Sequence, residues 1–402
     1  MMIKDLFQIQ NYKLFLTNMT MLGMAVAITA PFLVIFMTET HGLSSTGYGI
    51  FMASAAVGSF FVNTIMGRYS DRLKFDRKYL IIAALFMQIM AFLSFLIIPN
   101  TWILIISYII FFSLGAPAMP QLYASARESI NQYRSGIAVM ANMILRSMFS
   151  FGFLFGPLVG SILLARYDFT GLFFGTVIMF AVVFMSSFLI KNSNPPAVEQ
   201  SIEITSYEEP KSPNLLTNMG LFIPFIAFVF LHVGQWMYLL NMPLFVTGYL
   251  GEADSAVGIL ASLCAGLEVP LMIFMGYVAS RVSSKTLLII AGFIGSMYFL
   301  SIGIFESYTM MLIGQLPLAL FLAILLGLGI SYFQDLLPQF PGYASTLFAN
   351  AMIVGQLVGN LLGGIANDTL GVENSFYISG AFLFIAFILF FFTKKEVRKG
   401  EI

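Results

Sequence analysis

Long, almost uncharged apolar runs dominate this chain and leave it very few possible folds. Of its 402 residues, 59% are hydrophobic and 9% are charged, whereas soluble domains carry roughly 25% charged residues. A helix needs about 20 apolar residues to cross the hydrocarbon core of a bilayer. Open sheets leave backbone groups unpaired in lipid, and these runs are too long for barrel strands. The sequence therefore predicts an all-α polytopic membrane protein surrounded by a lipid bilayer.

Twelve transmembrane helices can be placed along the chain, six in each half. We expect the first six at 14–37, 47–66, 79–98, 102–124, 136–164 and 170–190. We expect the second six at 217–246, 255–279, 286–304, 308–333, 342–366 and 374–392. The first run continues beyond Met37 without a small-residue cleavage pattern, so we interpret it as a span and not as a removable signal.

Positive charges are concentrated in alternate loops. Because translocation disfavours Lys and Arg, short loops that are rich in these residues stay in the cytoplasm. One alternating set of segments holds Lys4, Lys13, Arg68, Arg72, Lys74, Arg77, Lys78, Arg127, Arg134, Lys191, Lys211, Arg281, Lys285, Lys394, Lys395, Arg398 and Lys399. The opposite set holds Arg166 as its only basic residue. This distribution predicts that both termini are cytoplasmic.

A polar stretch and an internal repeat divide the chain in two. Residues 191–214, rich in Pro, Ser and Glu, predict a cytoplasmic linker between an N-terminal half, 1–190, and a C-terminal half, 215–402. The repeated pairs, 208 or 209 residues apart, are Gly49-Ile50 with Gly258-Ile259, Met66-Gly67 with Met275-Gly276, and Ala141-Asn142 with Ala349-Asn350. They predict two pseudo-symmetric six-helix bundles with a substrate site between them.

The loop GRYSDRLKFDRK after the second run contains a spaced motif. Gly67, Asp71 and Arg72 form a G-x-x-x-D-R pattern. Gly67 permits a tight turn or close packing, and Asp71 can cap a helix start or pair with Arg127 or Arg72. A loop that only fixes topology explains the positive charges but not this spacing. Ser280 stands at the Asp position of the corresponding loop in the second half, so we expect an asymmetric gate.

The fifth run carries glycines at regular spacing beside a proline. Gly152, Gly156, Pro157 and Gly160 form a G-x-x-x-G-P-x-x-G pattern. Such glycines let helices approach closely, and a proline removes one backbone hydrogen bond and permits a bend. Plain helix packing and a bending element are both compatible with this pattern.

Two ionisable residues lie deep within spans. Arg146 is about 15 Å from the start of the fifth span, and Glu268 is about 12 Å from the end of the eighth, at 1.5 Å per residue. A charge at such depth costs about 2.5 to 3.5 kcal/mol on insertion scales, so it usually has a role. We expect Glu268 to couple transport to protons with Arg146 as its partner. A purely structural ion pair is the alternative.

Amide and aromatic side chains also occur inside the spans. They are Gln121, Asn142, Gln235, Trp236, Tyr238, Asn241, Gln334, Asn350, Gln356 and Asn360. Tyr238 and Asn241 fall with Gly234 on one helical face. Amides donate and accept hydrogen bonds, and with aromatic faces they suit a neutral hydroxylated substrate. We expect most of this set to bind substrate together with Arg146 and Glu268, although hydrogen bonding between helices would explain any one amide.

Several functional classes lack sequence support. Cys264 is the only cysteine, and His41 and His232 are the only histidines, so no metal site or cofactor is expected. No H-E-x-x-H or G-x-S-x-G motif indicates a membrane-embedded enzyme. Nineteen basic residues balance nineteen acidic ones, so charge does not indicate a nucleic-acid partner. A passive channel would not need two repeated halves with a bending element in one span.

With these motifs in view, the chain resembles the bacterial sugar efflux transporters of the major facilitator superfamily. The most specific segments are AMPQLYASARES at 118–129, MYLLNMPLF at 237–245, AGLEVP at 265–270 and FQDLLP at 333–338. The G-x-x-x-D-R loop resembles a motif of this superfamily, and the glycine–proline run resembles one of its antiporters.

This resemblance implies export of sugars such as lactose, glucose or related glycosides, driven by inward proton movement. We expect the carrier to be a monomer in the bacterial plasma membrane. A multidrug or metabolite efflux pump on the same fold is the alternative. Two positions depart from the family pattern. The fourth span lacks the usual mid-helix arginine, because Arg127 lies at its end, and Thr29 stands where some relatives have glutamine. No proton role is therefore assigned to an arginine of the fourth span, and no sugar contact is assigned to Thr29.

Overall fold

The computed structural model describes residues 8–69, 76–134, 138–191, 214–279, 281–338 and 340–393, and all regular elements within them are helices. The first half contains α2 (Tyr12–Thr29), α3 (Leu33–Ile35), the π-helical turn η1 (Phe36–Thr40), α4 (Ser45–Tyr69), α5 (Arg77–Ile97), α6 (Thr101–Gly115), α7 (Ala118–Arg134) and α8 (Ala138–Ser187). The second half contains α9 (Met219–Leu244), the π-helical turn η4 (Phe245–Tyr249), α10 (Asp254–Ala279), α11 (Ser284–Phe305), α12 (Tyr308–Ile313), α13 (Gln315–Leu336), α14 (Pro341–Leu370) and α15 (Val372–Phe391).

The described residues form eleven helical segments long and apolar enough to span a membrane. The longest of them, in α8, contains two spans, because Tyr167 and Asp168 break its helical backbone. Gly160 and Thr176, on either side of this break, both contact the end of α2 at Ile28 and Thr29. The chain therefore reverses within α8, and the prediction of twelve transmembrane helices is confirmed.

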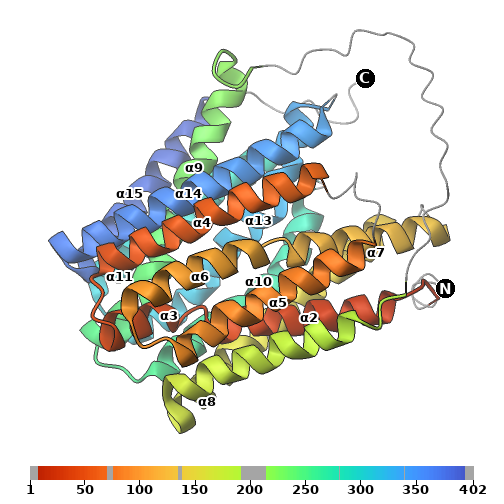
Figure 1. Ribbon diagram of the computed structural model, residues 1–402. Helices are drawn as coiled ribbons and strands as arrows, with labels where there is room; N and C mark the ends of the chain where they lie inside the picture. The colour runs from red at the N-terminus through yellow and green to blue at the C-terminus, as the bar shows by residue number, and fades with distance from the viewer. Residues whose placement is uncertain are drawn as a thin grey trace.

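The helices pack into one bundle with two distinguishable ends (Figure 1). We call the end where α2 and α9 begin and α15 finishes the terminal end. The opposite end, where the loops 41–44, 98–100 and 250–253 lie, is called the far end.

The two halves repeat each other in backbone detail. The π-turns η1 and η4 end the first and seventh spans 209 residues apart, the same separation as the sequence repeat. Each is followed by a glycine in the left-handed region, Gly42 with φ 66° and Gly251 with φ 71°, a conformation that side chains other than glycine rarely adopt. The prediction of two pseudo-symmetric bundles is confirmed.

The same lysine contact also closes each half at the terminal end. Lys78 Nζ donates to the Phe188 carbonyl at 2.8 Å, and Lys285 Nζ donates to the Phe391 carbonyl at 3.1 Å. Because unpaired carbonyls end each helix, a cation placed there is favourable. Each lysine begins the third span of its half and holds the end of the sixth.

Two helix pairs form most of the contact between the halves. The pairs are α4 with α14, which lie side by side in Figure 1, and α8 with α10. Gly49 of α4 packs on the backbone of Asn360, and a Cβ added to Gly258 of α10 would lie 2.7 Å from the Pro157 carbonyl oxygen. Both close contacts belong to the far-end half of the bundle. The predicted linker lies outside the described residues except for its first and last positions, so the proposed domain boundaries remain predictions.

Candidate functional site

The two membrane-embedded charges lie across the boundary between the halves. Along the pair α8 and α10, Gly258 meets Pro157 near the far end, and the next level brings Leu154 within 3.0 Å of a Cβ added to Gly266. Closer to the terminal end, Arg146 of α8 and Glu268 of α10 interact electrostatically.

Arg146 and Glu268 face different surroundings. The Arg146 side chain is exposed in the structure, whereas Glu268 is partly buried. Within the described chain, no direct ion pair joins them. Two opposite charges that interact without a direct ion pair can attract each other more or less strongly as the halves move. A shorter separation in a less polar environment strengthens the attraction.

A third side chain, which we did not predict from the sequence, lies beside this pair. The Tyr123 hydroxyl of α7 is buried without a hydrogen-bond partner among the described residues, and the charge of Arg146 acts on it. An unpaired buried hydroxyl costs free energy, so it is a natural partner for a ligand or a water molecule. Tyr123 lies two residues from the predicted site residue Gln121 in the fourth span, and this proximity is the sequence signal that could have identified it.

Gln235 and Trp236 lie where α9 packs on α14. His232 Nδ1 and Gln235 Oε1 form a hydrogen bond of 2.9 Å, and the indole nitrogen of Trp236 is buried without a partner among the described residues. Gly355 and Gly359 of α14 let that helix approach His232 and Trp236 closely. The indole nitrogen is therefore available as a donor at the edge of this helix pair.

Tyr238 and Asn241 have partners inside the second half. The hydroxyls of Tyr238 and Tyr298 are 3.5 Å apart, and Gln315 Nε2 donates to Tyr298 at 3.2 Å. Asn241 donates to the Gly363 carbonyl at 3.1 Å and accepts from Asn367 at 2.9 Å. The structure thus places these two residues in contacts between helices of one half.

Gln121 and Gln334 also have partners, both nearer the terminal end. Gln121 Oε1 accepts from Arg77 Nη1 at 2.8 Å, and Arg77 forms an ion pair with Glu128 at 2.8 Å. Gln334 donates to the Ser345 hydroxyl at 3.1 Å, which joins α13 to α14.

The other predicted amides are distributed along α8 and α14. Asn350 and Gln356 are partly buried on α14, and Asn360 is buried with its amide nitrogen unpaired among the described residues. Asn142 belongs to α8, but its side chain lies outside the described part of the structure.

The residues of the G-x-x-x-D-R loop are only partly described. Gly67 belongs to the last turn of α4, whereas Asp71 and Arg72 lie outside the described residues. Arg127 belongs to α7, and its side chain is likewise outside them. The predicted gate at this loop remains a prediction.

The glycine–proline run of the fifth span has two different neighbours. Gly152, Gly156 and Gly160 all face α2, where a Cβ on Gly152 would collide with the Thr20 carbonyl oxygen. The carbonyl of Pro157 instead meets α10 of the other half. The glycines therefore bring two helices of one half together, and the proline lies at the boundary between the halves.

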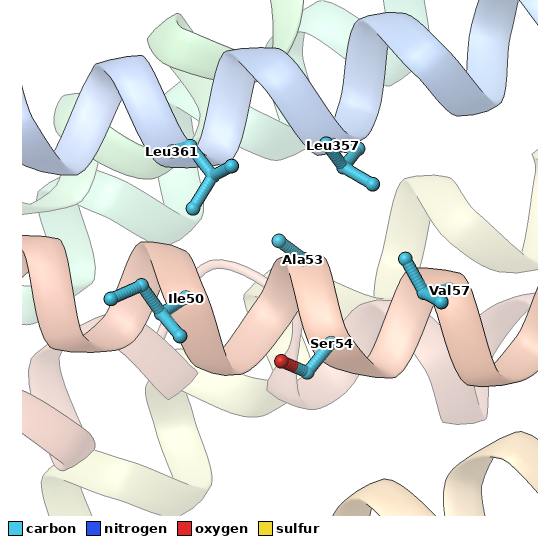
Figure 2. A pocket seen from close by; sticks show the side chains of 6 residues that line it. All are labelled: Ile50, Ala53, Ser54, Val57, Leu357 and Leu361. Atoms are coloured by element: carbon cyan, nitrogen blue, oxygen red, sulfur yellow. The ribbon is translucent and has the colours of Figure 1, made fainter.

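A crevice of about 320 Å³ lies between α4 and α14 and is shown in Figure 2. Leu357 and Leu361 point from α14 toward α4, which supplies Ile50, Ala53, Ser54 and Val57. This lining is almost wholly apolar, so it offers few groups for a hydroxylated ligand. Among the described residues, no three His, Cys, Asp or Glu side chains are grouped as a metal site requires.

Comparison with known proteins agrees with this architecture. The family model of the Major Facilitator Superfamily matches residues 15–231 and 224–402. The chain therefore belongs to the Major Facilitator Superfamily, a class of multi-pass membrane transporters built from two six-helix halves.

Within that superfamily, the predicted resemblance to bacterial sugar efflux transporters is confirmed. The chain is 30% identical to Sugar efflux transporter C of Escherichia coli (strain K12) over 92% of this chain and 93% of that protein. It is 29% identical to Sugar efflux transporter A of Dickeya chrysanthemi over 92% of both chains.

Solved structures show the same fold at lower identity. The nucleoside transporter NupG superposes with a TM-score of 0.78 at 13% identity, covering 95% of this chain and 98% of that one. A D-xylose-proton symporter superposes with a TM-score of 0.74 at 14% identity, covering 96% and 97%.

Proposed function

We propose that this protein exports sugars or glycosides across a bacterial plasma membrane, with both termini in the cytoplasm. The observation that carries the proposal is the 30% identity to Sugar efflux transporter C over nearly the full length of both chains. The concentration of basic residues in alternate loops supports the orientation. We infer that the carrier acts as a monomer and has no enzymatic activity.

The contacts between the halves support an alternating-access cycle. Gly49 with Asn360 and Gly258 with Pro157 pack closely in the far-end half of the bundle. In the proposed orientation these contacts close the site from the outside. Cargo would then enter from the cytoplasm, and separation of the same contacts would release it outward.

The charges between α8 and α10 support a proton-coupled cycle. Proximity of Arg146 favours the ionised form of Glu268, whereas burial away from water favours its neutral form. Exchange requires that sugar and proton occupy the site in turn. A sugar whose hydroxyls donate to the ionised Glu268 carboxylate, beside Arg146, would be released when Glu268 takes up a proton from the outside. Loss of that proton to the cytoplasm would restore the carboxylate for the next sugar, so the two facing states would differ in the protonation of Glu268.

Unpaired polar groups in both halves favour a sugar over a lipophilic cation. Tyr123, Trp236 and Asn360 each carry a buried group without a hydrogen-bond partner among the described residues. These groups include two N–H donors and a hydroxyl, which match the hydroxyls of a sugar. A bound sugar would supply the hydrogen bonds that these groups lack in the free carrier.

Two transport measurements test the proposed cargo. Overexpression in intact cells should lower the accumulation of a non-metabolised labelled glycoside, because outward export is faster. Energised inverted vesicles should take up the same labelled sugar, and vesicles without the carrier provide the background. Transport of a drug or dye cation without any sugar transport would overturn the proposal in favour of a multidrug pump.

A further inference from the structure

A carboxylate of one half caps a helix of the other half at the far end. Asp368, near the end of α14, accepts from the backbone nitrogens of Ser45 at 3.0 Å and Thr46 at 2.7 Å. These two residues begin α4. The first backbone N–H groups of a helix have no partner within it, and the helix dipole favours negative charge there.

The cap exists only while the two helices touch. Gly364, one turn before Asp368, packs on the backbone of Ser45, and Gly49, one turn into α4, packs on the backbone of Asn360. With glycines at both contacts, the helices approach closely along the two turns of α14 that precede the carboxylate. An aspartate side chain is short, so a separation of a few ångströms would break both hydrogen bonds.

Like charges oppose this contact at the same end of the molecule. Glu39 of the first half and Asp254 of the second lie near enough for their charges to act on each other. Because both carboxylates are negative when ionised, their repulsion favours separation of the far ends. The closed far end is therefore a balance between an attractive contact and a repulsive one.

The cap also borders a space that both halves share. A pocket of about 400 Å³ at the far end is lined by Asp368 together with Thr38, Tyr249 and Asn367. Thr38 belongs to η1 and Tyr249 to η4, so the paired π-turns form two of its walls. Opening the cap would therefore widen an existing space.

We propose that Asp368 is a positioning residue of the transport cycle that sets how often the far end is closed, by capping α4 across the boundary between the halves. The inference rests on the alternating-access part of the proposed function, but on neither the sugar nor the proton. Loss of the cap should raise the population that is open at the far end by about fivefold, the factor that corresponds to the typical cost of losing a helix cap.

Distances between spin labels measure this population directly in the full-length carrier. Cys264 is the only cysteine, so Cys264→Ser gives a background for two label pairs in lipid nanodiscs without sugar. Trp102 and Phe305, 73% and 57% exposed, report on the far end. Leu189 and Met219, 69% and 64% exposed, report on the terminal end.

Three substitutions of Asp368 should change the two distances by different amounts. Asp368→Ala should lengthen the far-end distance and shorten the terminal-end distance. Asp368→Asn retains one acceptor oxygen and should give a smaller shift, and Asp368→Glu, which keeps the carboxylate, should restore part of the closed population. If Asp368→Ala does not fold, the Asn and Glu variants decide between the two outcomes by the same distances.

Two further variants separate a conformational role from a general loss of charge. Asp254→Asn removes the repulsion with Glu39 and should shift the far-end distance in the opposite direction. Asp168→Asn, at an exposed far-end position within one half, should shift nothing.

The proposal is overturned if the distances of the Asp368 variants match those of the unmodified carrier, or if Asp168→Asn shifts them equally. Failure of the proposed function has a different signature. If the carrier moves no sugar but Asp368→Ala still changes the distances, the proposed cargo is wrong and the proposed role of Asp368 stands.

Discussion

At the scale of single residues, the pair Arg146 and Glu268 offers the most direct test of coupling. Glu268→Gln keeps the size and a hydrogen-bonding group but can no longer take up and release a proton. We expect it to retain sugar exchange between equal concentrations and to lose accumulation driven by a pH difference. Labelled-sugar flux in proteoliposomes measures both.

A structural role for the same pair would give a different result. A structural role would require that the two residues form a buried ion pair, and removing one partner of such a pair typically destabilises a protein by about 3 to 5 kcal/mol. Thermal unfolding of Glu268→Gln should therefore be compared with the unmodified carrier before transport. Proton-driven accumulation at the unmodified rate would exclude Glu268 as the coupling group and turn attention to Asp335.

Tyr123 supports a second residue-scale prediction. Tyr123→Phe removes only the hydroxyl that is unpaired in the described structure. If that hydroxyl binds sugar, its loss should raise the KM for sugar by about fivefold with little change in kcat, because one hydrogen bond contributes about 1 kcal/mol. An unchanged KM would place Tyr123 outside the sugar site.

Several site residues could not be located from the sequence alone. In the sequence, Arg77 indicates only which side of the membrane its loop occupies, whereas in the structure its guanidinium donates to Gln121. Hydropathy identifies which residues are buried in a span but does not give the rotation of one helix against another. That rotation decides whether an amide such as Asn241 faces a neighbouring helix or the boundary between the halves.

At the scale of elements, the close packing of α2 on α8 should contribute measurably to the stability of the protein. Gly152→Ala places a Cβ against the Thr20 carbonyl oxygen, and because backbone atoms cannot move aside cheaply, overpacking should cost about 1 to 3 kcal/mol. Thermal unfolding in detergent should show the loss.

Gly276 provides the matched control for this substitution. A Cβ added there meets nothing within 4 Å, so Gly276→Ala should leave the unfolding temperature nearly unchanged. Equal effects of the two substitutions would mean that the helix contact at Gly152 is not what stabilises the bundle.

The elements themselves were largely predictable, because span length and apolar composition are physical requirements of the bilayer. The tight reversal at Tyr167 and Asp168 was located between two predicted spans, although few polar residues mark it. The π-turns η1 and η4 were not predicted, since they depend on backbone hydrogen bonding that no apolar pattern encodes.

At the scale of the whole molecule, the predicted orientation can be tested by labelling from outside the cell. Glu252 is exposed in a far-end loop, and Leu216 is exposed at the terminal end. In a Cys264→Ser background, Glu252→Cys should react with an impermeant thiol reagent in intact cells. Leu216→Cys should react only after the cells are opened, and the reverse pattern would invert the topology.

The lysine contacts at the terminal end also bear on how the chain is assembled. Lys78 and Phe188 are 110 residues apart, and Lys285 and Phe391 are 106 apart, so each contact closes within its own half. The ribosome has therefore delivered every group that the first contact needs before it begins the second half. The first half can therefore form its lysine contact as soon as its own six spans are in the membrane, without waiting for the second half.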